Sequence, residues 1–322
     1  MSFMKNQTKK IIFKIFHRLA LRASENKAVI LNFHRVSHQS ETEFDDSMSA
    51  LEFREKMRFL KQHFNVISLS ELIERAESQS IEPLTVAITI DDGYQDGYDV
   101  IYPILKELEL SATYFIATEG LQAGCLWNDQ ITGAFENTKV NRLAGFLDLA
   151  EFDLTIAKDK AKAHAAVQKK CKFMPLEQRS AAIETLQKIL QVDVNKQIFL
   201  TKAQIKELHA NGMLIGAHTH RHPILALEQD ANSHFEILES KNNLEAILHD
   251  KVDIFAYPNG KEGQDFSQAH VDMLEEIGFN SAVMTTWGHV TPKTNKLMLP
   301  RFTPWDSDVT KFAIRLCNFF RK

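Results

Sequence analysis

Val86-Ala87-Ile88-Thr89-Ile90-Asp91-Asp92-Gly93-Tyr94 joins a run of β-branched apolar residues to two adjacent carboxylates and a glycine. The apolar run is typical of a buried strand. Because neighbouring side chains at a strand end point apart, Asp91 and Asp92 can serve different partners, one a metal ion and the other a proton. Carboxylates at the C-terminal mouth of a buried parallel strand are typical of α/β enzymes. The alternative is that Asp-Asp-Gly is only turn chemistry.

Strand and helix patterns alternate on both sides of this stretch. Apolar runs predict strands at 28–33, 66–68, 112–117, 213–217, 252–256, 281–284 and 297–302. Helical spacing of apolar residues predicts helices at 52–64, 99–108, 202–211, 232–249 and 270–277, with Thr201 as an N-cap and Gly212 and Gly278 as stops. Most of the strands end in polar residues. This alternation predicts an α/β fold built on a parallel sheet or barrel.

One segment interrupts the alternation. Residues 127–194 are rich in Ala, Lys, Glu and Leu, with helical periodicity and few strand patterns. We interpret the segment as a helical insertion that covers one rim of the barrel and shapes a substrate cleft. No ligand pattern is visible in it, and His164 is expected on the surface of a helix.

Composition places the chain among ordinary soluble globular proteins. It has 322 residues, of which 44% are hydrophobic and 25% charged. The formal net charge of −4 gives no indication of a nucleic-acid partner. The 3 cysteines are odd in number, widely spaced and without a CxxC pair, which predicts reduced thiols in a cytosolic protein.

Both ends of the chain combine basic and apolar residues. Residues 1–24 contain no acid, and Lys14, His17 and Arg18 interrupt the apolar positions, which argues against a signal peptide and excludes a transmembrane helix. The pattern predicts a basic amphipathic helix that lies on an anionic membrane surface or docks on the protein's own core. A similar pattern occurs at 311–322. We therefore expect a cytoplasmic protein, in peripheral contact with the inner face of the cytoplasmic membrane.

A second site pattern is His218-x-x-x-His222, which directly follows a predicted strand. Two imidazoles at this spacing can bind one ion, and Asp92 is the expected third ligand. Three protein ligands leave a position open for water, as in catalytic metal sites. The alternative pairs His218 with His220, as in the His-x-His motif of amidohydrolase barrels.

Together these motifs resemble a known family. Thr89-Ile90-Asp91-Asp92-Gly93-Tyr94 resembles the Thr-Phe-Asp-Asp-Gly motif of the NodB-homology polysaccharide deacetylases, carbohydrate esterase family 4. His218-Thr219-x-x-His222-Pro223 resembles that family's His-Ser/Thr-x-x-His-Pro motif. The resemblance implies a distorted (β/α)7-type barrel of NodB type over residues 25–322 that holds a divalent ion, usually zinc. It implies Asp92, His218 and His222 as metal ligands and Asp91 as the general base.

The family's third motif, Arg-x-Pro-Tyr/Phe, is incomplete here. In Ala256-Tyr257-Pro258-Asn259-Gly260 the arginine that normally pairs with the catalytic aspartate is replaced by Ala256. Arg301, at the end of the last predicted strand, is our expected substitute. The backbone N–H of Asn259 is expected to serve the oxyanion. Tyr257 is either a packed aromatic or a substrate contact.

The general acid has two candidates. The family's C-terminal Leu-x-His motif is not found, but Asn32-Phe33-His34-Arg35 resembles a motif of the poly-N-acetylglucosamine deacetylase branch, in which an early histidine takes that role. We therefore expect His34 to protonate the leaving amine. His289 is the rival acid or a substrate contact, and Trp287 either stacks on a sugar or packs internally.

These expectations give one main function and two alternatives. The main function is a metal-dependent hydrolase that removes an N-acetyl or related acyl group from an amino sugar of a polysaccharide or of its lipid-linked or nucleotide-linked precursor. The first alternative is an amidohydrolase acting on a cyclic amide, which requires His220 at the metal. The second is an inactive glycan-binding barrel, which only the missing third-motif arginine supports.

Overall fold

The computed structural model describes residues 2–38, 44 and 47–321, and the side chains of the first helix from Ile12 onward. Residue 1 and the side chains of Lys5, Lys9, Lys10 and Ile11, which contribute to the basic pattern at the N-terminus, lie outside this description.

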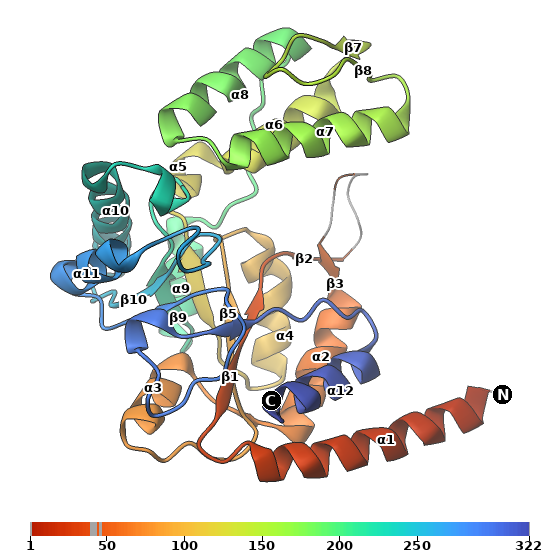
Figure 1. Cartoon of the computed structure of the whole chain (residues 1–322), viewed down its shortest axis with the longest axis vertical. Coiled ribbons are helices and arrows are strands. Elements are labelled where there is room, and N and C mark those ends of the chain that lie inside the picture. Colours follow the sequence, from red (N-terminus) through yellow and green to blue (C-terminus); the bar gives the residue numbers. More distant parts are fainter. Residues whose placement is uncertain (1, 39–43, 45–46, 322) are drawn as a thin grey trace.

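In the described part of the chain, a path of seven parallel strands forms the centre of the molecule (Figure 1). In spatial order the strands are β12 (Arg301–Phe302), β1 (Ala28–Phe33), β5 (Thr85–Ile90), β6 (Thr113–Ile116), β9 (Leu214–Ala217), β10 (Ile254–Ala256) and β11 (Ser281–Val283). The short strand β4 (Asn65–Val66) pairs with β5 outside this path. The predicted parallel architecture is confirmed.

The two ends of the strand path meet, so the sheet is a nearly closed barrel. Val283 of β11 forms a parallel bridge with Leu299, two residues before β12. The backbone N–H of Leu299 donates to Ala282 at 2.8 Å, and the N–H of Met284 donates to Leu299 at 2.9 Å. The predicted (β/α)7-type barrel is therefore correct. The last strand is shorter than the predicted 297–302, because Lys296–Met298 forms a 3-10 turn, η3.

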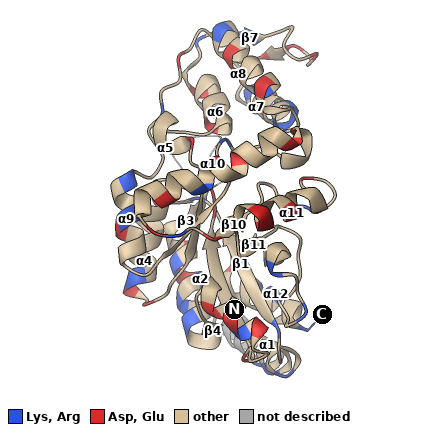
Figure 2. Cartoon of the chain, turned by 90° about the vertical axis from the view of Figure 1, so that its left-hand side faces the viewer, with Lys and Arg blue, Asp and Glu red and all other residues tan. Residues whose placement is uncertain are grey.

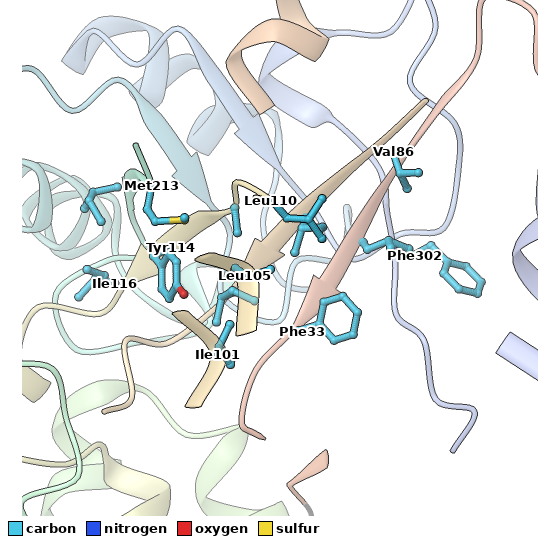
Figure 3. Packing of buried hydrophobic residues seen from close by; sticks show 14 of the residues in the cluster. Phe33, Val86, Ile101, Leu105, Leu110, Tyr114, Ile116, Met213 and Phe302 are labelled. Atoms are coloured by element: carbon cyan, nitrogen blue, oxygen red, sulfur yellow. The ribbon is translucent and has the colours of Figure 1, made fainter. Parts of the chain in front are cut away.

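Strand periodicity sorts the barrel side chains into two sets. Every residue of β1 and β5 is buried, as expected for strands covered on both faces. Ile30 and Ala87 belong to the inner cluster, whereas Leu31 and Ile88 belong to the larger cluster between the sheet and the outer helices. Figure 3 shows part of this outer packing, in which Tyr114 lies beside Leu105 and Ile101. Phe33 and Val86 belong to the same cluster.

Helices surround the barrel, and α9 (Lys202–Ala210) begins with the N-cap that the sequence predicted. The surrounding helices are α2 (Ala50–His63), α3 (Leu69–Glu77), α4 (Tyr102–Glu107) with its preceding π-turn η1 (Gly97–Ile101), α9, α10 (Asp230–Leu248) and α11 (Gln268–Ile277). Thr201 caps α9 and forms a reciprocal capping box with Gln204. The shorter elements are β2 (Val36–Ser37), β3 (Met48–Ser49), α5 (Gly120–Ala123) and the 3-10 turn η2 (Leu225–Leu227).

Residues 127–190 form a separate layer at one end of the molecule (top of Figure 1). It contains α6 (Trp127–Asn137), α7 (Ala157–Lys172) and α8 (Leu176–Leu190), which enclose their own apolar cluster. The sequence did not predict the small antiparallel pair between α6 and α7, formed by β7 (Arg142–Leu143) and β8 (Phe152–Asp153).

Helices from the two chain ends pack against each other at the opposite end of the molecule (Figure 1). Phe13 of α1 (Ser2–Ala23) meets Phe59 of α2 edge to face, and Arg321 lies over the ring of Phe16 just after α12 (Val309–Phe320). The opposite side of α1 exposes Ile15 and Leu19. Among the described residues, no helix has the length and apolar content needed to cross a membrane. Acidic and basic residues are interspersed over the outer helices (Figure 2).

Candidate active site

Asp91 and Asp92 lie at the C-terminal end of β5, where their side chains take different directions. Asp91 continues the inward alternation of Ala87 and Thr89, so its carboxylate lies in the mouth of the barrel. Asp92 has a positive φ of 80°, which an aspartate tolerates better than a β-branched residue. This backbone conformation turns the second carboxylate towards the loop after β9.

Three side chains form a possible metal site in this mouth. Asp92 Oδ1 lies 3.5 Å from Nε2 of His218 and 3.5 Å from Nε2 of His222. The ligand atoms of all three residues lie within 4.8 Å of one another. Nδ1 of His218 is 2.7 Å from the carbonyl oxygen of Ala256 and donates its hydrogen there, which leaves the Nε2 lone pair facing Asp92.

The donor set of this group suits a divalent metal ion. One carboxylate and two imidazole nitrogens are the ligands that zinc and similar ions accept, and three of them leave a position free. Burial and the neighbouring His218 lower the pKa of His222 to about 3, so its ring is neutral and has a lone pair to offer. Burial opposes ionisation of Asp92, but its contacts with both histidines hold its pKa below the usual value. The residues present therefore fit a metal.

A buried arginine pairs with Asp91. The Arg301 guanidinium makes two parallel hydrogen bonds to the carboxylate, both 2.7 Å long, and its side chain is fully buried. It also donates to Asn32, Thr89 and the carbonyl of Met284. Burial raises the pKa of Asp91, but the charge and hydrogen bonds of Arg301, together with the charges of His218 and His34, lower it overall. Arg301 thus occupies the place of the arginine missing at Ala256.

His34 directly follows β1, and its ring lies close to the carboxylate of Asp91. Its Nε2 is 3.9 Å from Oδ2 of Asp91, and 45% of its side chain is exposed. The ring is therefore close to the paired carboxylate and open to an incoming molecule. This position is compatible with proton transfer to a bound substrate.

The three possible metal ligands, Asp91 and His34 line a cavity of about 570 Å³ that opens to solvent. Asn259 lies in its wall with a positive φ of 59°, and Trp287 lies at its edge with 47% of its surface exposed. A second cavity of about 480 Å³ shares His34, Asp92 and Trp305 with the first. The two form one extended groove across the barrel mouth.

Two residues predicted at the site are elsewhere. Tyr257 is fully buried, stacks on Phe266 at 3.8 Å and donates its hydroxyl to Leu297. Its interpretation as a packed aromatic is correct, and the structure does not support a substrate contact. His289 lies against Phe319, with Nε2 3.0 Å from that residue's carbonyl oxygen, and is absent from the residues described as lining the groove. This position corrects the expectation of a rival acid.

The structure does not support the alternative ligand pair of His218 and His220. Nδ1 of His220 lies 2.9 Å from the hydroxyl of Thr118, and its ring is 6.4 Å from that of Phe235. His220 is not part of the Asp–His–His group found among the described residues. The amidohydrolase interpretation therefore lacks its second histidine ligand.

Sequence reasoning missed the residues that the insertion contributes to the groove. Trp127, Asn128 and Lys172 line the cavity from α6 and α7. Asp129, next to them, accepts a hydrogen bond of 3.0 Å from the hydroxyl of Tyr94, and burial raises the pKa of Asp129 to about 6. The Leu126-Trp127-Asn128-Asp129 run carries no periodic or ligand-spacing signal by which these roles could have been predicted.

The fold and site together define a class: a NodB-like parallel barrel with a possible Asp–His–His metal site at its C-terminal mouth. The sequence model of the polysaccharide deacetylase family matches residues 79–145 and 150–282, and the chain belongs to that family. The match includes the Asp-Asp pair, the histidine motif and most of the insertion.

Curated relatives match over a shorter segment. A poly-β-1,6-N-acetyl-D-glucosamine N-deacetylase from Staphylococcus epidermidis is 30% identical over 113 residues, which are 30% of this chain and 38% of that protein. The Staphylococcus aureus protein of the same name is 31% identical over 111 residues. The matched segment thus spans little more than a third of these relatives.

Solved structures resemble the chain over most of its length. IcaB from Ammonifex degensii gives a TM-score of 0.60 at 17% identity and covers 92% of this chain and 98% of its own. The Streptococcus pyogenes deacetylase PplD, solved with acetate, gives 0.57 at 20% identity and covers 86% and 92%. At these identities the likeness establishes the fold.

Proposed function

We propose that this protein is a metal-dependent hydrolase that removes an N-acetyl group from an amino sugar of a glycan. One observation carries the proposal. The Asp–His–His group and the Asp91–Arg301 pair lie side by side at the mouth of an open groove, so that ligands and base face the same space. Membership of the polysaccharide deacetylase family and the names of the staphylococcal relatives support the same reaction.

Each residue has one role in this proposal. Asp92, His218 and His222 hold the metal, which when bound activates water and polarises the acyl oxygen. Asp91, kept ionised and oriented by Arg301, accepts the proton of the attacking water. The C–O bond to the acetyl carbon forms, the C–N bond breaks, and His34 gives its proton to the departing sugar nitrogen. Acetate and a free amine result.

The oxyanion that develops on the acyl oxygen needs a hydrogen-bond donor. The backbone N–H of Asn259 makes no hydrogen bond within the described residues, and Asn259 lies in the groove wall. The backbone carbonyl of Asn259 is held in place because the hydroxyl of Thr285 donates a hydrogen bond to it. We assign the N–H to the oxyanion.

Zinc is the metal that we propose. Two imidazoles and one carboxylate form a mixed nitrogen–oxygen set, which zinc accepts more readily than magnesium or calcium. Iron, cobalt and nickel accept similar ligands, so the metal content of the purified protein decides among them.

The substrate that we propose is a polymer of N-acetylglucosamine or a lipid-linked or nucleotide-linked amino-sugar precursor. The open groove has room beyond the reacting acetamide, and Trp287 and Trp305 expose 47% and 78% of their surfaces beside it. Exposed aromatic faces of this kind stack on sugar rings. The relatives named for poly-N-acetylglucosamine support the polymeric choice.

We also propose a cytoplasmic enzyme in peripheral contact with the inner face of the cytoplasmic membrane. Exposed Ile12, Ile15 and Leu19 form a stripe along α1, and Arg18 and Arg22 lie exposed beside it. Apolar residues next to cations suit an anionic lipid surface. The cysteines Cys125, Cys171 and Cys317, all buried and free, fit a reducing compartment.

The test is the variant Asp91→Asn, assayed for acetate release from N-acetylglucosamine oligomers and for bound metal. We expect activity to fall by about 10²–10⁴-fold, because the base is lost, while metal content stays at the wild-type level. Asp99→Asn, an exposed aspartate nearby, is the control. Unchanged acetate release would remove Asp91 from the mechanism. A metal-loaded wild type that releases no acetate would refute this substrate class.

A further inference from the structure

The loop that carries His218 and His222 has an unusual backbone. Thr219 and His222 have positive φ values of 63° and 55°, a region that non-glycine residues rarely occupy. One internal hydrogen bond of 3.1 Å, from the N–H of His222 to the Thr219 hydroxyl, closes the turn. A backbone in this region persists only when its surroundings hold it.

Two buried charged side chains from different helices hold the loop. Glu236 of α10 is fully buried and accepts hydrogen bonds from the backbone N–H and from Nε of Arg221, at 2.6 and 2.7 Å. Arg179 of α8 donates to the carbonyl oxygens of Arg221 at 3.0 Å and His222 at 3.4 Å. The carbonyl of the ligand His222 is therefore bound by a side chain from the insertion.

The environment of Arg179 is specialised for this contact. Its side chain is only 3% exposed, and within the described residues it makes no ion pair with a carboxylate. The guanidinium lies 4.7 Å from the ring of Trp127, which lines the groove. Burial lowers the pKa of Arg179 to about 10. The charges of Glu119, Glu228 and Glu236 act on this buried cation without touching it, and its hydrogen bonds go to the ligand loop.

We propose that Arg179 is a positioning residue, through which the helical insertion fixes the backbone of His222 in the conformation that binds the metal. Arg179 touches neither the metal nor the substrate. It acts through the carbonyl groups of the loop, and its contact with Trp127 joins the groove wall to the same loop. The inference rests on the proposed metal site but goes beyond it, because it makes metal affinity depend on the insertion.

The experiment measures zinc affinity of the full chain by competition with a chromophoric chelator, below the melting temperature of every variant. In Arg179→Met the two carbonyls lose their donor, and we expect the affinity to fall about 10–100-fold, as for other residues that support metal ligands. Arg179→Lys keeps a cation that can donate a hydrogen bond to one of the two carbonyls. We expect its zinc affinity to lie between those of Arg179→Met and the wild type.

Two matched controls lie in the same insertion. Arg142→Met removes an arginine that is 72% exposed and pairs with Glu151. Leu186→Ala opens the buried core of the insertion without touching the ligand loop. We expect both to bind zinc within about threefold of the wild type, although Leu186→Ala lowers the melting temperature by large-to-small truncation.

The outcomes separate this inference from the function that it builds on. A wild type that binds no zinc refutes the metal site itself. A wild type that binds zinc, with Arg179→Met equally tight, refutes only the role of Arg179. If Leu186→Ala weakens zinc binding as much as Arg179→Met does, general destabilisation explains the effect and the positioning role is wrong.

Discussion

At the scale of single residues, the pair of Asp91 and Arg301 controls the chemistry that we propose. A carboxylate that is 2% exposed would be protonated more easily than in water, yet the adjacent guanidinium, together with the charges of His218 and His34, holds its pKa low. Both oxygens of Asp91 accept hydrogen bonds from Arg301, which also fixes the direction of the carboxylate. Arg301 therefore fixes the orientation of the base and makes the largest contribution to keeping it ionised.

Replacing Arg301 by Met should change the pH dependence of the reaction. Because Arg301 lowers the pKa of Asp91, its removal raises that pKa, and the base is then protonated at a higher pH. We expect the acidic limb of kcat/KM to move to higher pH and the plateau rate to fall about 10–100-fold. The measurement is kcat/KM between pH 5 and 9 on the metal-loaded protein.

Two further variants make this prediction falsifiable. Removal of one partner of a buried ion pair costs about 3–5 kcal/mol, so Arg301→Met can also lower stability. Arg301→Lys keeps the charge and should keep the acidic limb near its wild-type position with a lower plateau. Arg315→Lys, on the partly exposed side of α12, should change neither. An unmoved acidic limb in a folded Arg301→Met protein would contradict the electrostatic argument.

At the scale of elements, α1 has two apolar sides, one packed against the protein and one exposed. Phe13, Phe16 and Ala20 face the barrel helices, so the expectation that this helix docks on the protein's own core holds for that side. Ile12, Ile15 and Leu19 are exposed, in the i, i+3, i+7 spacing of one helical stripe. The exposed stripe carries the membrane proposal.

Replacing Ile15 and Leu19 together by Gln should weaken membrane binding if the stripe makes the contact. We expect the wild type to float with vesicles that contain anionic lipid and not with neutral vesicles, because apolar insertion and charge attraction act together. The double variant should bind at least about tenfold more weakly, because two exposed apolar side chains that would enter the lipid are lost. Flotation with both kinds of vesicle measures the effect.

The control for this prediction is Leu51→Gln, which removes an apolar side chain that is 66% exposed on α2. It should float as the wild type does. Wild-type protein that stays in the soluble fraction with anionic vesicles would refute the membrane contact. If the wild type self-associates without lipid and the double variant does not, the stripe binds a second copy of the chain instead of a membrane.

At the scale of the whole molecule, the possible metal site joins strands that are distant in the chain. Asp92 follows β5, whereas His218 and His222 follow β9, and β6 lies between them in the sheet. A metal held by all three ligands would bind the folded barrel and not the unfolded chain. Binding of this kind stabilises the fold by mass action.

Removing the metal should therefore lower the melting temperature. A free metal concentration of 100 times its Kd adds about 2.7 kcal/mol to the free energy of unfolding, which corresponds to a shift of roughly 5 °C for a protein of this size. We expect this shift between chelated and zinc-loaded wild type, measured by calorimetry. Asp92→Ala should melt at the same temperature with and without zinc, whereas Asp99→Ala should keep the shift. A zinc-dependent shift in Asp92→Ala would place the ion elsewhere.

Much of the architecture was predictable from local patterns. The strands β1, β5 and β6 and the helices α9 and α11 lie within a few residues of their predicted positions, because apolar periodicity and end-capping residues encode them locally. The Asp-Asp pair and the histidine pair were visible for the same reason, since each motif is a short run after an apolar strand. Thr201 shows this well, because its capping box with Gln204 lies within four residues.

The remaining features depend on which distant segments the barrel brings together. Arg301 pairs with Asp91 across 210 positions, and Arg179 meets the ligand loop across more than 40. Tyr257 and His289 follow site-like patterns, yet packing against Phe266 and Phe319 takes them away from the groove.

The sequence by itself therefore determined the parallel strand–helix alternation and the short runs that present carboxylates and imidazoles at strand ends. The tertiary structure alone decided which cation faces the base, which histidine turns away from the ligand group, and which insertion residues line the groove. The physical reason is the separation along the chain over which each interaction acts. Hydrophobic periodicity acts between neighbours in the chain, whereas charge pairing and groove shape arise only when the closed barrel places remote segments within a few ångströms of one another.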